Sequence, residues 1–167
     1  MTHHMRRHAA ALLGFLLLAV IATWPLPLHL RSAFTGAPSG DTGVYVWNVW
    51  VFQHEIQQGR LPFYTSSIMS LSQQDAGPVN LSLHNYTTFS NLLAWPLVPL
   101  FGLVAAFNLV FLFNIALSGF GAWLLARDLT GRSAESFLAG ALFALSPVLI
   151  ARGSDHFSLV AAAPLPI

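Results

Sequence analysis

Long apolar runs separated by short polar segments dominate the pattern of hydrophobic positions along this chain of 167 residues. The runs without an internal charge lie over residues 9–28, 89–102, 103–126 and 137–151, and a further run begins near residue 159. A helix needs about 20 apolar residues to cross the hydrocarbon core of a bilayer. The pattern therefore predicts transmembrane helices over about 9–28, 103–126 and 134–152, with another span starting near 159.

The run over 89–102 is short for a span and contains Pro96 and Pro99, each of which removes a backbone donor that lipid cannot replace. We therefore expect an interfacial or re-entrant helix on the outer face. Positive charges favour this topology, because arginines concentrate in short cytoplasmic loops. If Arg6–Arg7 and the loop 127–132 both lie inside, two crossings separate them. In the alternative topology, 89–102 is a true span and every later segment is inverted.

Residues 31–88 form a polar and aromatic loop that this topology places outside the membrane. A turn-rich entry over 36–41 and a break at Gly59 predict a helix over 42–58. Its start is rich in aromatic residues and its end is polar, as is typical of a helix at the membrane interface. We expect His54 and Glu55, about four turns from Asp41, to be solvated; Glu55 is also a candidate substrate-binding residue.

The composition agrees with a membrane protein, since 55% of the residues are hydrophobic and only 8% are charged. A net charge of +1 offers no basic field for nucleic acid, and no nucleic-acid partner is expected. Cysteine is absent, and His3, His4 and His8 are interpreted as a solvated tail, so no metal site is expected. The predicted fold class is all-α, a polytopic transmembrane helical protein.

The two ends of the chain carry further information. No small-residue cleavage site directly follows the first apolar run, which favours an uncleaved first span with a cytoplasmic N-terminus. The chain stops within the apolar run 159–167, so we expect the N-terminal part of a longer protein.

Several short motifs lie at spacings that resemble those of another membrane protein class. They are Trp24-Pro25, Ser39-Gly40-Asp41, the stretch 57–62 ending in Leu61-Pro62, the stretch 93–102, Ala126-Arg127-Asp128 with Leu129-Thr130-Gly131, and Phe143-Ala144-Leu145-Ser146-Pro147. As a set, they resemble the N-terminal region of the GT-C membrane glycosyltransferases, the class that includes protein mannosyltransferases and lipid A aminoarabinose transferases. The resemblance implies transfer of a sugar from a polyprenyl phosphate to an extracytoplasmic acceptor, and a bacterial inner (plasma) membrane location.

The resemblance assigns the acidic residue after the first span as the catalytic base or acceptor-orienting group, and Asp41 is the residue that fits. Thr42 and Gly43 follow it, so a paired-carboxylate mechanism is not supported at this position. Transfer from a lipid-phosphate sugar needs a carboxylate to deprotonate or orient the acceptor. Aspartate directly before a helix is also a favoured N-cap, and both roles remain open.

Arg152, Asp155 and His156 follow the span over 134–152, and the predicted topology places them on the same face as Asp41. The resemblance implies that an acidic residue in this loop shapes the active site, a role that Asp155 fits. His156 is a candidate for binding phosphate or a metal, and Arg152 for pairing with a lipid phosphate. The alternatives are an ordinary pair of polar residues at a helix end and an arginine that snorkels toward headgroups.

Two other function classes remain open. The first is a transporter or flippase component, although the predicted spans lack the ionisable residues that ion coupling normally requires. The second is a non-catalytic integral membrane protein. The expected partners are the lipid bilayer and a polyprenyl-phosphate sugar; the sequence identifies no cofactor and no protein partner.

Overall fold

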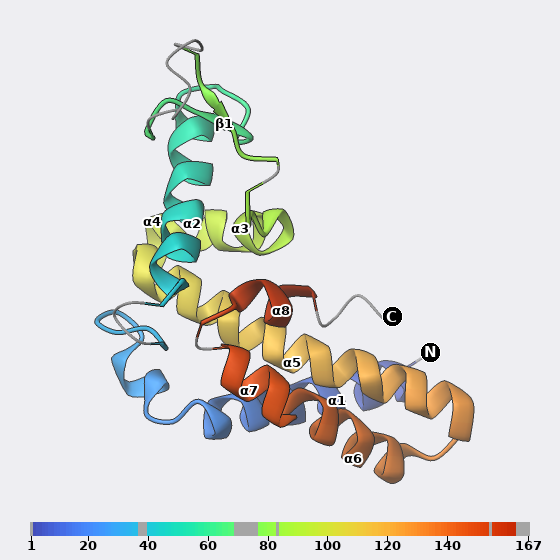
Figure 1. Ribbon diagram of the computed structural model, residues 1–167. Coiled ribbons are helices and arrows are strands. Elements are labelled where there is room, and N and C mark those ends of the chain that lie inside the picture. The colour runs from blue at the N-terminus through green and yellow to red at the C-terminus, as the bar shows by residue number, and fades with distance from the viewer. Residues whose placement is uncertain (1, 37–39, 69–76, 83, 154, 163–167) are drawn as a thin grey trace.

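The computed structural model describes residues 2–36, 40–68, 77–82, 84–153 and 155–162, and this part of the chain is mostly helical (Figure 1). The helices are α1 (Thr2–Ala22), η1 (Leu26–His29), α2 (Thr42–Gln57), α3 (Thr88–Ala94), η2 (Trp95–Leu97), α4 (Val98–Phe101), α5 (Leu103–Thr130), α6 (Ser133–Ala144), α7 (Pro147–Gly153) and α8 (Phe157–Ala162). Strands β1 (Tyr64–Thr65) and β2 (Val79–Asn80) form one antiparallel pair, in which Tyr64 lies opposite Asn80.

Helix α5 is the centre of a bundle, with α1 and α6 packed along it (Figure 1). The start of α1 lies beside the end of α5, because the His8 ring contacts Trp123 with centroids 5.4 Å apart and His8 Nε2 lies 3.2 Å from the Arg127 guanidinium. Helices α1 and α5 are therefore antiparallel. The histidine-rich start is part of α1 and not a tail, and His8 packs against α5, contrary to the expectation that it would be solvated.

Small residues bring α5 and α6 close together. Gly119 of α5 and Gly140 of α6 are buried, and a Cβ added at Gly140 would collide with the carbonyl oxygen of Gly119. The ring of Phe15, 1% exposed, fills the space beside both glycines. Close approach of backbones through small residues is the way in which helices in membranes obtain tight packing.

Two of the predicted spans have different helix bounds in the structure. Helix α1 ends at Ala22 and not at Leu28, because the segment Trp24-Pro25-Leu26-Pro27 cannot supply consecutive backbone donors. The segment predicted over 134–152 is divided into α6 and α7, which are bent by 41°. Pro147 starts α7 and has no N–H to continue the hydrogen bonds of α6.

The segment from Thr88 to Phe101 is a broken apolar helix made of α3, η2 and α4, and Pro96 lies at the break. It packs across the first half of α5, where Asn114 donates a hydrogen bond to Ser90 Oγ over 3.1 Å. Because α5 runs antiparallel to α1, the chain crosses the length of the bundle twice between Arg7 and Arg127. Two crossings are what the predicted topology requires, and the orientation in a membrane stays a prediction.

Two helices, Met5–Ala22 of α1 and α5, are long and apolar enough to cross a membrane, and the bent pair α6–α7 is a third candidate if it counts as one span. Large apolar side chains project from the bundle surface, among them Leu13 and Leu17 of α1 and Leu138 and Leu142 of α6. So many exposed large apolar side chains on helices of this hydropathy are typical of a surface that faces lipid. The chain thus has the character of an integral membrane protein.

Helix α2 projects away from this bundle and carries the β1–β2 pair at its far end (Figure 1). Its bounds agree with the helix predicted over 42–58. Gly59 follows it with a φ of +70°, a left-handed conformation that glycine adopts without strain and that ends the helix.

Candidate functional site

Asp41 directly precedes α2 and is exposed. Its carbonyl oxygen accepts the first helical hydrogen bonds, from the amides of Val44 and Tyr45. Its carboxylate, in contrast, makes no capping hydrogen bond with the described first turn of α2. The residue therefore has the position of an N-cap without the side-chain interaction of one, and its carboxylate is accessible at the surface.

Arg152, Asp155 and His156 lie where α7 gives way to α8. The Arg152 carbonyl oxygen accepts hydrogen bonds from the amides of Asp155, at 3.1 Å, and of His156, at 2.6 Å, which fixes a tight turn between the two helices. Arg152 is exposed, whereas Asp155 and His156 are partly buried. Nδ1 of His156 is buried and has no hydrogen-bond partner among the residues that the structure describes.

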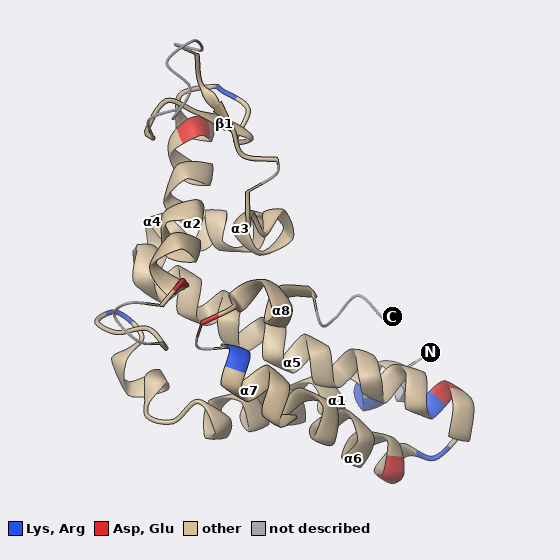
Figure 2. Cartoon of the chain, in the orientation of Figure 1, with Lys and Arg blue, Asp and Glu red and all other residues tan. Residues whose placement is uncertain are grey.

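Tyr45, one turn into α2, connects these two regions. Its hydroxyl donates to Ser158 Oγ of α8 at 3.0 Å, and its ring contacts the Phe157 ring with centroids 5.5 Å apart. Asp41 is four residues before Tyr45, and Asp155 is two residues before Phe157. We call the contact of Tyr45 with Phe157 and Ser158 the α2–α8 joint. It brings the Asp41 end of α2 to the α7–α8 turn, and Figure 2 shows acidic positions at both places.

A second set of hydrogen bonds holds the start of α2 from the other side. Asn85, just before α3, donates to the Tyr45 hydroxyl, and its own carbonyl oxygen accepts a bond of 2.9 Å from Asn48 Nδ2. Tyr45 and Asn48 have no exposed surface. Buried polar groups that find partners rigidify the segments they join. The start of α2 is thus fixed to α8 and to the segment before α3.

Asn108, inside α5, fixes the approach to Asp41. Its Nδ2 donates to the carbonyl oxygens of Leu30 and Ala33, at 2.8 and 2.7 Å. Those carbonyls belong to the irregular segment after η1, which no helix or strand satisfies. A polar residue in an otherwise apolar helix therefore anchors the backbone that leads to α2.

Glu55 lies at the expected distance from Asp41 but in a different environment from the one expected. It lies near the end of α2, fourteen residues and about 20 Å along the helix axis from Asp41. Its side chain is fully buried, not solvated. Arg60 Nε lies 2.5 Å from one carboxylate oxygen, and Thr65 Oγ1 donates to the other at 2.8 Å. The expectation of a solvated Glu55 is wrong because the chain reverses after Gly59 and brings both partners back to the helix.

The Arg60 hydrogen bond holds the pKa of Glu55 below its usual value of 4.5, against the opposing effect of burial, with Thr65 adding to the effect. Close by, burial raises the pKa of the Tyr86 phenol, which donates to the Pro62 carbonyl oxygen at 2.7 Å. A cavity of about 320 Å³ adjoins Glu55 and Arg60. We call the end of α2 together with the β1–β2 pair the tip. These interactions explain the tip as a folded unit, and they do not bring Glu55 to the Asp41 region.

A small cavity of about 90 Å³ lies between α1, α5 and α7. It has the volume of roughly three water molecules. Within the described ranges, no cluster of three or more histidine and acidic side chains is placed to hold a metal ion.

Sequence reasoning selected the charged residues of this region and missed the uncharged ones that hold it together. These are Tyr45, Asn48, Asn85, Asn108 and Ser158. Tyr45 is one of the aromatic residues at the start of the helix predicted over 42–58, and the sequence gives it no role beyond the membrane interface. The available signal was the presence of asparagines inside apolar helices, where an unpaired amide is costly.

Residues 89–164 match a protein-family model described as a domain of unknown function (DUF6311). The match includes Arg152, Asp155 and His156 and excludes α1, α2 and Asp41. No curated protein and no solved structure matches the chain. The comparisons thus show a similarity to a domain without a known activity, and none of them points to a glycosyltransferase.

Proposed function

We propose that this chain forms the base-bearing part of a membrane glycosyltransferase, which moves a sugar from a polyprenyl phosphate to an acceptor outside the cytoplasm. The observation that carries the proposal is the α2–α8 joint, because it holds an exposed, uncapped Asp41 at the same end of the bundle as the α7–α8 turn. A carboxylate and an arginine at one membrane face suit the two ends of this reaction, the acceptor and the leaving phosphate.

In the proposed step, Asp41 takes the proton of the acceptor hydroxyl as its oxygen attacks the anomeric carbon. The bond from that carbon to the phosphate oxygen breaks, and the polyprenyl phosphate leaves with the electron pair. The configuration at the anomeric carbon inverts. Arg152 pairs with the phosphate, Asp155 orients the sugar or acceptor, and the unpartnered Nδ1 of His156 offers one more polar contact.

The test is transfer of radiolabel from polyprenyl-phosphate mannose and polyprenyl-phosphate aminoarabinose, in membranes that contain the full chain. Removal of a general base typically costs about 10²- to 10⁴-fold in rate, so Asp41→Asn is expected to lower transfer by at least about 100-fold. Asp128→Asn is the matched control, because Asp128 is exposed at the opposite end of α5. Insertion and abundance of both variants, measured by immunoblot of the membranes, are expected to equal those of the unmodified chain.

A transporter component and a non-catalytic anchor both predict that Asp41→Asn behaves like Asp128→Asn. Equal transfer by the two variants would therefore contradict the assignment of Asp41. If the unmodified chain transfers neither mannose nor aminoarabinose, this result would contradict the transferase proposal for these sugars.

A further inference from the structure

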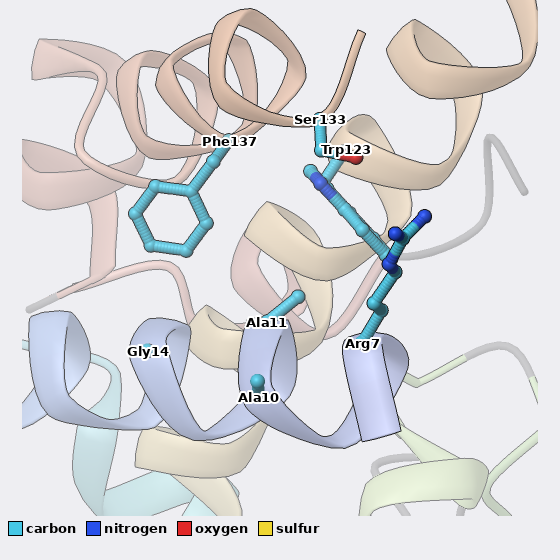
Figure 3. A pocket seen from close by; sticks show the side chains of 7 residues that line it. All are labelled: Arg7, Ala10, Ala11, Gly14, Trp123, Ser133 and Phe137. Carbon is cyan, nitrogen blue, oxygen red and sulfur yellow. The ribbon is translucent and has the colours of Figure 1, made fainter. Parts of the chain in front are cut away.

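A groove lies at the opposite end of the bundle from Asp41. It has a volume of about 590 Å³ and runs between α1, α5 and α6 (Figure 3). Its lining residues are Arg7, Ala10, Ala11, Gly14, Trp123, Ser133 and Phe137. Its volume falls within the range of small-molecule sites, about 300–1,000 Å³.

The shape of the groove follows from the residues on its two sides. On the α1 side, Ala10, Ala11 and Gly14 leave the helix surface low, and on the α6 side the Phe137 ring forms a wall (Figure 3). Phe137 is held in place because it stacks on Phe15, with ring centroids 4.5 Å apart. The result is a smooth apolar channel between two helices.

The groove is placed to receive a lipid. The helices that border it, α1 and α6, carry exposed leucines, with Leu13 and Leu138 more than 60% exposed. Met5–Ala22 of α1 is long and apolar enough to cross a membrane. An apolar channel between two such helices is in contact with acyl chains once the protein is in a bilayer.

Arg7 gives the groove a charged end. Four arginines and two carboxylates gather at this end of the bundle: Arg6, Arg7, Arg127, Arg132, Asp128 and Glu135. Arg127 lies over the Trp123 ring, 5.1 Å from its centroid, and Arg132 pairs with Glu135 at 3.5 Å. No carboxylate of the described residues forms an ion pair with Arg7. Its guanidinium extends from α1 beside the Trp123 and Ser133 end of the groove (Figure 3).

We infer that this groove is a binding site for one membrane phospholipid with an anionic headgroup. The phosphate pairs with Arg7 near Ser133, and one acyl chain lies along Ala10 and Gly14 against Phe137. The charge complementarity of Arg7 selects the occupant, since basic pockets between transmembrane helices bind anionic headgroups. The inference does not rest on the proposed transferase function, because the groove and the α2–α8 joint contact different parts of α5. Trp123 of the groove lies about 24 Å along the helix axis from Phe107, which contacts Phe157 of the joint.

The test is native mass spectrometry of the full chain in detergent, titrated with phosphatidylglycerol or with phosphatidylcholine of the same acyl chains. We expect one phosphatidylglycerol to bind about tenfold more tightly than phosphatidylcholine, a factor that corresponds to ~1.4 kcal/mol. Arg7→Gln is expected to remove this preference. Arg6→Gln is the matched control, because Arg6 carries the same charge and does not line the groove.

A second pair of variants tests the apolar part. Ala10→Trp fills the groove and is expected to weaken binding of both lipids, whereas Ala9→Trp adds the same side chain at an exposed position outside it. Equal effects of Arg6→Gln and Arg7→Gln would overturn the inference in favour of a diffuse positive field. Binding of glycerol 3-phosphate as tight as that of the lipid would overturn it in favour of a site for free phosphate.

Discussion

Replacing Gly140 with alanine tests the closest contact in the bundle. A Cβ at this position would collide with the carbonyl oxygen of Gly119 and would lie 2.7 Å from Phe15 Cζ. Neither group can move aside, because the first belongs to the α5 backbone and the second to a ring that is 1% exposed. The helices themselves must separate to accommodate the methyl group.

The expected effect is the difference between two opposing terms. Overpacking of a tight core costs about 1–3 kcal/mol. Alanine in place of glycine stabilises a helix by up to ~1 kcal/mol. Gly140→Ala is therefore expected to lower the free energy of unfolding by up to about 3 kcal/mol, the upper limit set by these two terms.

The assay is reversible unfolding by SDS in detergent micelles, followed by circular dichroism, and Gly43→Ala is the control. Gly43 lies in the first turn of α2, and nothing lies within 4 Å of a Cβ added there, so only the helix propensity changes. This variant is expected to raise stability by about 0.5 kcal/mol. A Gly140→Ala variant that is as stable as Gly43→Ala would refute the close approach of α5 and α6.

Two further predictions concern the tip and the topology. Because the pKa of Glu55 is lowered in the folded chain, its pair with Arg60 stabilises the fold at pH values above the usual 4.5, and the contribution is lost as the pH falls through the lowered value. Glu55→Gln is therefore expected to lower the midpoint of unfolding at pH 7. The difference in midpoint between this variant and the unmodified chain is expected to shrink as the pH falls below 4.5, and a difference that stays constant while the carboxylate is protonated would contradict the ion pair. In this cysteine-free chain, Ser32→Cys is expected to react with a membrane-impermeant maleimide in intact cells, and Ser133→Cys only after lysis. The reverse pattern would invert the membrane orientation, and labelling of both positions in intact cells would contradict a crossing between them.

The helices best predicted from the sequence are those whose ends carry a local signal. Helix α5 starts after Gly102 and is followed by Gly131, and both glycines have a positive φ. The apolar run over 103–126 predicted the start of this helix. Helix α2 begins after Asp41 and ends before Gly59, as the turn-forming residues indicated. In both cases the signal lies within a few residues of the boundary, and no distant contact is needed to read it.

The sequence was less informative where the outcome depended on prolines within apolar runs. Hydropathy alone joined α6 and α7 into one segment, although Ser146-Pro147 breaks it. It also extended α1 across Pro25 to Leu28. Hydropathy measures the cost of transfer into lipid, whereas a helix end depends on backbone donors, and the two coincide only when no proline lies inside the run.

The charged residues of the candidate site could be predicted from the sequence, but the contacts that bring them together could not. Asp41, Arg152 and Asp155 stand out because charges are rare in this chain, but their grouping depends on Tyr45 reaching Ser158 across 113 residues of sequence. No spacing rule gives such a contact. Glu55 shows the same limit, since its burial depends on Arg60 and Thr65 returning after a chain reversal.

The buried asparagines indicate why the Asp41 end can be both irregular and ordered. Asn48 donates to the Asn85 carbonyl oxygen, Asn108 to the carbonyls of Leu30 and Ala33, and Asn114 to Ser90 Oγ. Irregular backbone near a bilayer must find partners inside the protein, because lipid offers none. Asn48 and Asn108 meet this need for two different segments, whereas Asn114 joins α5 to the side chain of Ser90 in α3. The polar residues of these helices thus supply hydrogen bonds to irregular backbone. Asp41 directly precedes α2, whose start is held by the hydrogen bond of Asn48 and by the α2–α8 joint.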